Sequence, residues 1–245
     1  MVSKNQIKLI ISLRQKKFRI EHQMFFAEGF KVISECVNSG YELMQLYTTD
    51  LNLFKEEEHK TELISEQELK KISALVTPNA CLAVFRIPKP KKIEDTGLLI
   101  ALDDIRDPGN LGTIIRLCDW FGVEQLFCSE NTVDVYNPKV IQATMGSISR
   151  VSVVYGDLYN FIATTKRPVY GTFMDSKSIY TEEFPKDAII VMGNESNGIS
   201  REIEKLIQYK ITIPRFGKIQ KTESLNVATA TGIILSEVQR KFNGM

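Results

Sequence analysis

Residues 96–122, TGLLIALDDIRDPGNLGTIIRLCDWFG, decide the fold of this chain. They begin with an apolar segment of strand length, 98–105, pass through a polar turn, and continue with a helical pattern. The apolar face of that helix consists of Leu111, Ile114, Ile115, Leu117, Cys118 and Phe121. At 100° per residue, Arg116 points away from this face. A buried strand that leads into an amphipathic helix is typical of α/β folds.

The same alternation of strand and helix continues to the end of the sequence. Further strands are predicted at 124–130, 152–156, 168–174, 188–195 and 210–214. Further helices are predicted at 137–148, 158–167, 201–209 and 226–242. Strands connected through helices run parallel, so we expect a largely parallel sheet with helices on both faces.

The N-terminal part of the chain reads as a separate, smaller α/β unit. Its predicted elements are a helix over 25–40, a strand over 42–50, a helix over 65–75 that opens with a Ser-x-x-Glu capping box, and a strand over 79–87. The segment 86–97, RIPKPKKIEDTG, contains two prolines and four basic residues, which is typical of a linker. We therefore predict two domains, 1–92 and 96–245.

Composition narrows the class of protein. The chain has 245 residues, 43% hydrophobic and 25% charged, which favours a globular fold over a disordered or collagen-like one. Its net charge of +1 predicts no overall preference for a charged partner. Four cysteines without C-x-x-C spacing and two histidines indicate neither a zinc site nor a disulfide framework, and favour buried thiols. The N-terminal apolar run is too charged for a signal peptide, so we expect a cytoplasmic protein without membrane or metal.

A local basic tract lies at the N-terminus. Residues 1–19 contain six basic residues and no acidic residue, and phenylalanines follow at 18, 25 and 26. Cations neutralise phosphates and aromatic rings stack on bases, so the tract is a candidate RNA-binding arm. The alternative is a solvated amphipathic helix whose phenylalanines belong to the core. The candidate RNA contacts are Arg14, Lys16, Lys17 and Arg19.

Three loops after predicted strands carry the unusual residues, at the sheet edge where α/β proteins bind ligands. The first, 103–122, offers glycines and a helix N-terminus to a phosphate, although Arg116 alone could be an ordinary surface residue. The second, 189–200, is IIVMGNESNGIS; it lacks the G-x-G-x-x-G and P-loop spacings and could be a tight turn. The third, 211–242, leads into the last helix through Ser224 and Asn226, either of which could be an N-cap.

Together the three loops resemble the motifs of a known family. DPGNLGTIIR, MGNESNGIS and IPRFG…ESLNVATATGIILSE resemble, in order, the three motifs of the SpoU/TrmH family of RNA 2′-O-ribose methyltransferases in the SPOUT superfamily. The resemblance covers residues 96–245. Residues 1–95 resemble, more loosely, the ribosomal-protein-like RNA-binding domain that many members carry in front.

The resemblance implies a deep trefoil knot in the C-terminal domain, a homodimer with the active site near its interface, and bound S-adenosylmethionine. It implies a cofactor site formed by Gly171, Thr172, Phe173, Met192, Gly193, Asn194, Ile213, Ser224, Leu225 and Asn226. It also implies catalytic or substrate-handling roles for Asn110, Arg116, Glu195 and Asn226, with Arg116 near the RNA.

These residue types suit methyl transfer to a ribose hydroxyl, which needs an ionising 2′-hydroxyl held in line and no metal. Arg116 is the key residue of the family, sometimes described as the base. A guanidinium stays protonated, however, so we expect Arg116 to hold a phosphate and stabilise the developing alkoxide. Glu195 would orient it, and water or phosphate would accept the proton.

Three positions depart from the commonest family pattern: Ser196 replaces a frequent glycine, Arg215 a frequent methionine, and Glu223 adds a charge before Ser224. Ribosomal RNA is favoured over transfer RNA, because the extra domain needs a structured stem or loop to bind. The alternative function is a non-catalytic RNA-binding protein on the same scaffold. A dinucleotide-dependent oxidoreductase lacks its phosphate fingerprint.

Overall fold

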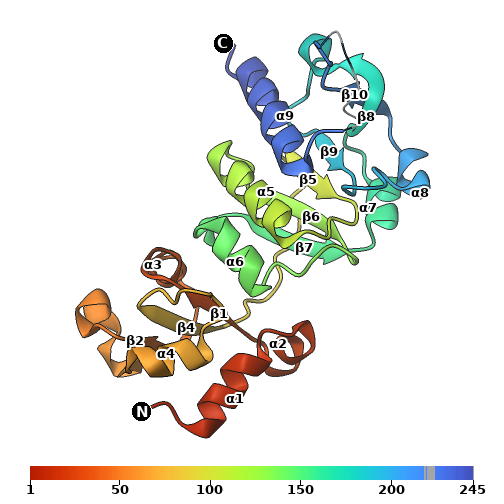
Figure 1. The fold of residues 1–245 in the computed structure, drawn as a ribbon. Helices are drawn as coiled ribbons and strands as arrows, with labels where there is room; N and C mark the ends of the chain where they lie inside the picture. The colour runs from red at the N-terminus through yellow and green to blue at the C-terminus, as the bar shows by residue number, and fades with distance from the viewer. Residues whose placement is uncertain (218, 220–223, 245) are drawn as a thin grey trace. The chain divides into compact units, whose positions relative to one another are not determined.

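The computed structural model describes residues 1–217, 219 and 224–244 (Figure 1). The chain is divided into two compact units. The first combines Met1–Lys89 with Asp134–Ser149, and the second combines Pro90–Val133 with Arg150–Met245. The sequence predicts residues 134–149 in the C-terminal domain, whereas in the structure they group with the first unit.

The first unit is built on a four-stranded sheet in the order β1-β4-β2-β3. Its strands are β1 (Met24–Glu28), β2 (Leu43–Thr48), β3 (Thr61–Leu63) and β4 (Cys81–Arg86). Its helices are α1 (Lys4–Ser12), α2 (Lys16–His22), α3 (Phe30–Asn38), the 3₁₀ helix η1 (Leu51–Lys60), α4 (Glu66–Ile72), α6 (Pro138–Thr144) and the 3₁₀ helix η2 (Ser147–Ser149). β4 pairs antiparallel with β1 and β2, and β2 pairs parallel with β3.

The predicted helix over 25–40 is wrong in its first part. Met24–Glu28 forms β1, and the helix begins only at Phe30, after Gly29 with a φ of 86°. Phe25 and Phe26 are both buried, so this strand shows no alternation of apolar and polar residues that would reveal it in the sequence. The burial confirms the core alternative for these two phenylalanines.

The second unit is built on a six-stranded sheet in the order β10-β8-β9-β5-β6-β7, in which every neighbouring pair is parallel. Its strands are β5 (Leu99–Leu102), β6 (Gln125–Ser129), β7 (Ser152–Gly156), β8 (Val169–Ser178), β9 (Ile189–Met192) and β10 (Tyr209–Thr212). Its helices are α5 (Pro108–Trp120), α7 (Leu158–Thr164), the 3₁₀ helix η3 (Ile179–Thr181), α8 (Arg201–Glu204) and α9 (Val227–Phe242). The predicted parallel α/β fold is confirmed.

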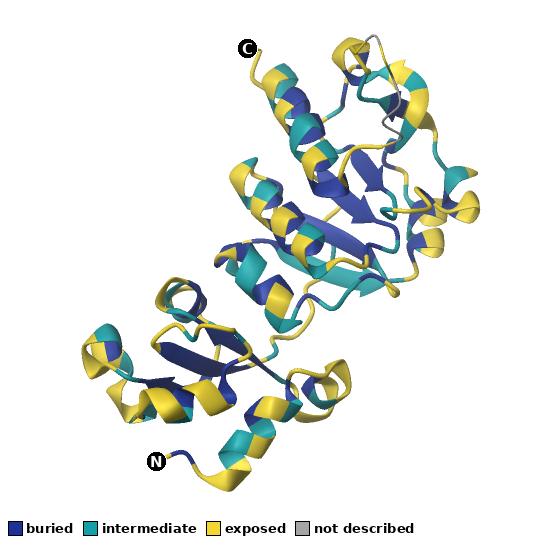
Figure 2. Ribbon diagram, viewed as in Figure 1, coloured by how far each residue is buried: buried dark blue, intermediate teal, exposed yellow. Residues whose placement is uncertain are grey.

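Helices cover both faces of this sheet. Leu99, Ala101 and Val191 form one core cluster with residues of α7 and α8. Side chains alternate along a strand, so Ile100 and Ile190 point to the opposite face, where α5 and α9 lie side by side (Figure 1). Figure 2 shows the central strands β5, β6 and β9 buried between helices that are each exposed on one side.

The predicted linker is fixed at its C-terminal end. The buried Arg167 side chain donates hydrogen bonds to the backbone carbonyls of Asp187 at 2.8 Å, Glu94 at 3.1 Å and Gly97. Gln125 accepts a further bond from the Glu94 amide at 2.6 Å. Residues 94–97 therefore belong to the second unit. Burial lowers the pKa of Arg167, although nearby acidic side chains oppose that shift.

Candidate cofactor and substrate site

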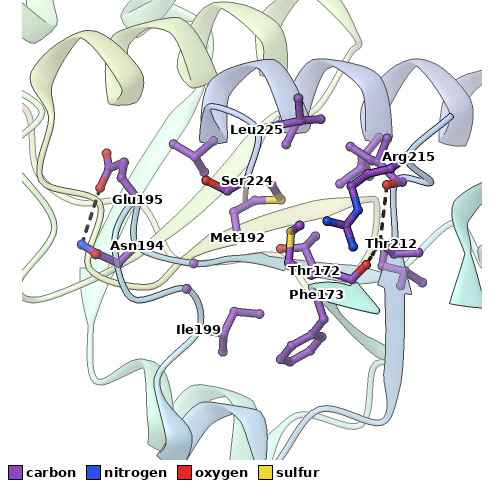
Figure 3. A pocket seen from close by; sticks show the side chains of 18 of the residues that line it. Thr172, Phe173, Met192, Asn194, Glu195, Ile199, Thr212, Arg215, Ser224 and Leu225 are labelled. Atoms are coloured by element: carbon purple, nitrogen blue, oxygen red, sulfur yellow. Dashed lines mark hydrogen bonds between the residues drawn. The ribbon is translucent and has the colours of Figure 1, made fainter. Parts of the chain in front are cut away.

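A pocket of about 750 Å³ lies beyond the carboxyl ends of β9 and β10 and against the middle of β8 (Figure 3). Its lining includes most of the residues predicted to bind the cofactor, namely Thr172, Phe173, Met192, Gly193, Asn194, Ile213, Ser224 and Leu225. Gly171 and Asn226 are not among the lining residues. The volume lies in the range of small-molecule and cofactor sites.

The loop after β9 forms one wall of the pocket and depends on Gly193. A Cβ atom at Gly193 would lie 2.2 Å from the carbonyl carbon of Gly198 and the amide nitrogen of Ile199. Asn194 and Gly198 exchange two backbone hydrogen bonds of 2.9 Å, which close the turn. The loop is thus a tight turn, the alternative left open above, and it also lines the pocket.

Two aspartates at the end of β5 hold this loop in place. Asp103, which is buried, accepts a 2.7 Å hydrogen bond from the amide of Ser200. The carbonyl of Asp104, whose φ is 59°, accepts one of 2.6 Å from the Asn194 side chain. The sequence analysis assigned no role to this pair. The available signal was two acidic residues directly after a fully apolar strand, a costly arrangement unless each carboxylate has a partner.

Three of the four predicted catalytic residues form one hydrogen-bonded chain. The Asn226 amide donates to Asn110 Oδ1 at 2.9 Å, and the Asn110 amide donates to Glu195 Oε1 at 2.9 Å. Asn226 Oδ1 also accepts from the backbone amides of Ala228 and Thr229 at 3.0 and 3.2 Å. Asn226 is therefore the N-cap of α9 and part of this chain, and the helix fixes the orientation of its amide.

Arg116 lies apart from this chain. It is exposed on α5, six residues after Asn110, which corresponds to about 9 Å along a helix axis. Among the described residues it has no hydrogen bond or ion pair. The Arg116 side chain is therefore available to contact a ligand.

The predicted RNA contacts of the first unit differ in their accessibility. Lys16 and Lys17 are exposed at the start of α2, and Arg14 donates hydrogen bonds to the carbonyls of Ile72 and Ser73. Arg19 is a correction. Its side chain is 3% exposed, forms a 2.5 Å ion pair with Asp134, and donates a 2.8 Å bond to the Leu13 carbonyl. Burial in this network leaves Arg19 unavailable to a phosphate.

The four cysteines are free and buried, as predicted. Burial raises the pKa of Cys81 to about 11 and that of Cys118 to about 12, so these thiols are neutral at physiological pH and poor nucleophiles. In residues 1–217, 219 and 224–244 no three His, Cys, Asp or Glu side chains gather as metal ligands would. Within the same residues, no helix combines the length and apolarity needed to cross a bilayer. Glu223 lies outside the described residues.

Comparison with known proteins assigns the family. The model of the SpoU rRNA methylase family matches residues 97–236, and that of the MRM3-like substrate binding domain matches residues 4–83. The chain belongs to the SpoU family. It is 27% identical to the 23S rRNA (guanosine(2553)-2′-O)-methyltransferase RlmP of Bacillus subtilis, over 95% of this chain and 96% of that one.

Solved structures support the same assignment. A TrmH-family protein from Porphyromonas gingivalis is 37% identical and superposes with a TM-score of 0.90, over 98% of this chain and 99% of that one. An AdoMet-bound rRNA methyltransferase from Sinorhizobium meliloti is 27% identical, with a TM-score of 0.86 and coverage of 98% and 97%. Both likenesses extend over both units of the chain.

Proposed function

We propose that this protein is an S-adenosylmethionine-dependent methyltransferase that methylates a ribose 2′-hydroxyl in structured RNA, with ribosomal RNA favoured. The observation that carries the proposal is the hydrogen-bonded chain of Asn110, Glu195 and Asn226 beside the pocket. One residue of this chain comes from each of the three family motifs. The names of the relatives, rRNA 2′-O-methyltransferase among them, support the substrate class.

The pocket suits S-adenosylmethionine in its chemistry. Met192, Ile213 and Val227 provide apolar walls for a nucleobase. Glu204 is paired with Lys210 and Arg215 with Asp175, so the Glu195 carboxylate leaves the described lining with a negative charge, which favours a cofactor that carries a cationic sulfonium. When bound, the cofactor supplies an electrophilic methyl group and a neutral thioether as leaving group.

The hydrogen-bonded residues and Arg116 hold the reacting hydroxyl in position and stabilise it. These residues would hold the 2′-hydroxyl in line with the methyl group that the cofactor supplies, and the hydroxyl proton would pass to water or a phosphate oxygen. Asn226 and Asn110 fix the Glu195 carboxylate at the pocket. Arg116 holds a phosphate and stabilises the developing alkoxide. Its forked geometry matters, so Arg116→Lys loses most of the rate.

The proposal includes a homodimer, a cytoplasmic location and the trefoil knot. Trp120 is 83% exposed on α5, one turn beyond Arg116, and a partner subunit seated there would cover its ring. A second copy seated on α5 would bring its own groups toward Arg116, which has no partner among the described residues of its own chain.

Calorimetric titration with S-adenosylmethionine and S-adenosylhomocysteine tests this function. We expect micromolar binding that is lost in Asn226→Ala, because that substitution removes the α9 cap and the bond to Asn110. Asn243→Ala, at the other end of the same helix, is the matched control and should bind normally. If the folded wild-type protein binds neither compound, even with RNA present, the non-catalytic RNA-binding alternative replaces the proposal.

A further inference from the structure

The rim of the pocket exposes an aromatic side chain next to a cation. Directly after β10 the chain passes through Arg215 and Phe216, both of which line the pocket. The Phe216 side chain is nevertheless 82% exposed. The deeper wall of Met192, Ile211 and Ile234 is buried, so Phe216 adds little to the fold and presents its ring to the space at the pocket mouth.

The composition of this rim indicates the kind of ligand. Residues 214–217 of this rim, PRFG, place a basic residue directly before an aromatic one and contain no acidic residue. Cations with an interleaved aromatic ring are the combination that binds single-stranded nucleic acid, because the cations neutralise phosphates while the ring stacks on a base.

The surroundings of the two side chains fit this combination. Figure 3 shows the Arg215 guanidinium extended over the pocket toward the Thr172 wall, and Arg215 forms a 3.5 Å ion pair with Asp175, which is itself 89% exposed. The ring of Tyr180 in η3 lies 6.4 Å from that of Phe216, at the outer limit of ring contact. Of these groups, Phe216 and Arg215 line the pocket, and the ring of Tyr180 lies outside its lining.

We propose that Phe216 stacks on a nucleobase of the RNA at or next to the modified nucleotide, while Arg215 contacts the adjoining phosphate. The proposal rests on the proposed function, which requires a ribose at this pocket mouth. A cofactor with a net positive charge does not explain a guanidinium at the rim. A two-fold contact centred on this rim would set Arg215 against Arg215 of the second copy.

Substitutions at Phe216 separate stacking from simple apolar contact. The probe is a fluorescein-labelled oligoadenylate of about 12 nucleotides, long enough for a single-strand site. Phe216→Ala and Phe216→Leu should each weaken its binding about tenfold, whereas Phe216→Trp should bind within about twofold of the wild type. Trp120 is the only tryptophan of the chain, so quenching beyond the wild-type level in Phe216→Trp reports stacking at position 216.

Two further measurements distinguish the alternatives. Tyr159→Ala, which removes an exposed ring that does not line the pocket, should bind the oligonucleotide like the wild type. S-adenosylmethionine should bind Phe216→Ala within about twofold of the wild type. A tenfold loss of cofactor affinity, a change of oligomeric state in Phe216→Ala, or unchanged RNA affinity would each overturn the proposal. The stacking assay does not require methyl transfer. If the wild-type protein binds RNA but no cofactor, the proposed enzymatic function is wrong, and the assay still tests whether Phe216 stacks on a base.

Discussion

The two units use buried and half-buried polar groups in opposite ways. In the first unit, Arg19 pairs with Asp134, and the buried Glu28 accepts bonds from the Ser73 hydroxyl and the Ala74 amide. These groups lie within the core and form their ion pairs and hydrogen bonds with one another. In the second unit, the chain of Asn110, Glu195 and Asn226 is equally well bonded, yet it lies beside an open pocket.

This difference indicates which polar groups support the fold and which serve a ligand. A buried charge must be paired with a neighbour, so removing its partner destabilises the unit that contains it. A half-exposed group at a pocket can exchange part of its solvent for a ligand, so its loss affects binding more than folding. Substitutions in each unit should therefore separate the two kinds of effect.

The largest expected effect is at Gly193. In Gly193→Ala the new methyl group would overlap the backbone of Gly198 and Ile199, so the loop must rearrange at a cost above about 3 kcal/mol. We expect the affinity for S-adenosylmethionine to fall more than about 100-fold in calorimetric titration, since this loop is a pocket wall. The first unit should stay folded.

Gly198→Ala is the matched control within the same turn. Gly198 has a φ of 68°, but a Cβ there would meet nothing within 4 Å. The substitution therefore carries only the conformational strain of a left-handed residue, about 1 kcal/mol. Equal losses of cofactor affinity in both variants would show that the loop conformation in general, and not the close approach at Gly193, determines binding.

The next effect in size is at Asp134. Asp134→Ala leaves the buried guanidinium of Arg19 without its carboxylate, which costs about 3–5 kcal/mol. Hydrogen–deuterium exchange should show this loss in the amides of β1 and β4, with those of β5 and β9 unchanged. Lys17→Ala, an exposed neighbour, is the control. Equal loss of exchange protection in both units would contradict the inference that this ion pair stabilises only the first unit.

The alternation of strand and helix was enough to predict most of the second unit. Apolar runs such as β5 and β9 are bounded by turn residues, and α5 has a regular apolar stripe. β1 escaped prediction because the sheet buries both Phe25 and Phe26, and part of its cover is α6, which lies more than a hundred residues later. Local sequence patterns do not report such distant contacts.

The candidate site could be predicted only in part. Asn110, Glu195 and Asn226 are recognisable by resemblance to family motifs, but spacing alone does not show that segments 85 and 116 residues apart meet through hydrogen bonds. Arg19 shows the opposite error. Six basic residues without an acidic one predict a solvated tract. Arg19 is instead buried in an ion pair with Asp134, a distant residue that comes near only in the folded chain.

The smallest expected effect is a pH dependence at Glu28. Burial raises the pKa of this carboxyl above 4.5, and the bonds from Ser73 and Ala74 and the charge of Arg14 only partly oppose the shift. The folded chain then holds the proton more tightly than the unfolded chain. The stabilisation from Glu28 is full below pH 4.5 and is lost as the pH rises through the folded pKa.

Glu28→Gln should remove that loss, because a neutral amide can still accept from Ala74 and donate to Ser73. In urea unfolding, the stability of Glu28→Gln relative to the wild type should rise as the pH is raised from about 4 to 7, in line with proton linkage. Glu21→Gln, at an exposed position of α2, should show no such trend. If the relative stability of Glu28→Gln falls with rising pH, the folded first unit prefers the ionised carboxylate. Glu28 would then behave like the half-exposed acidic residues of the pocket and not like a buried core group.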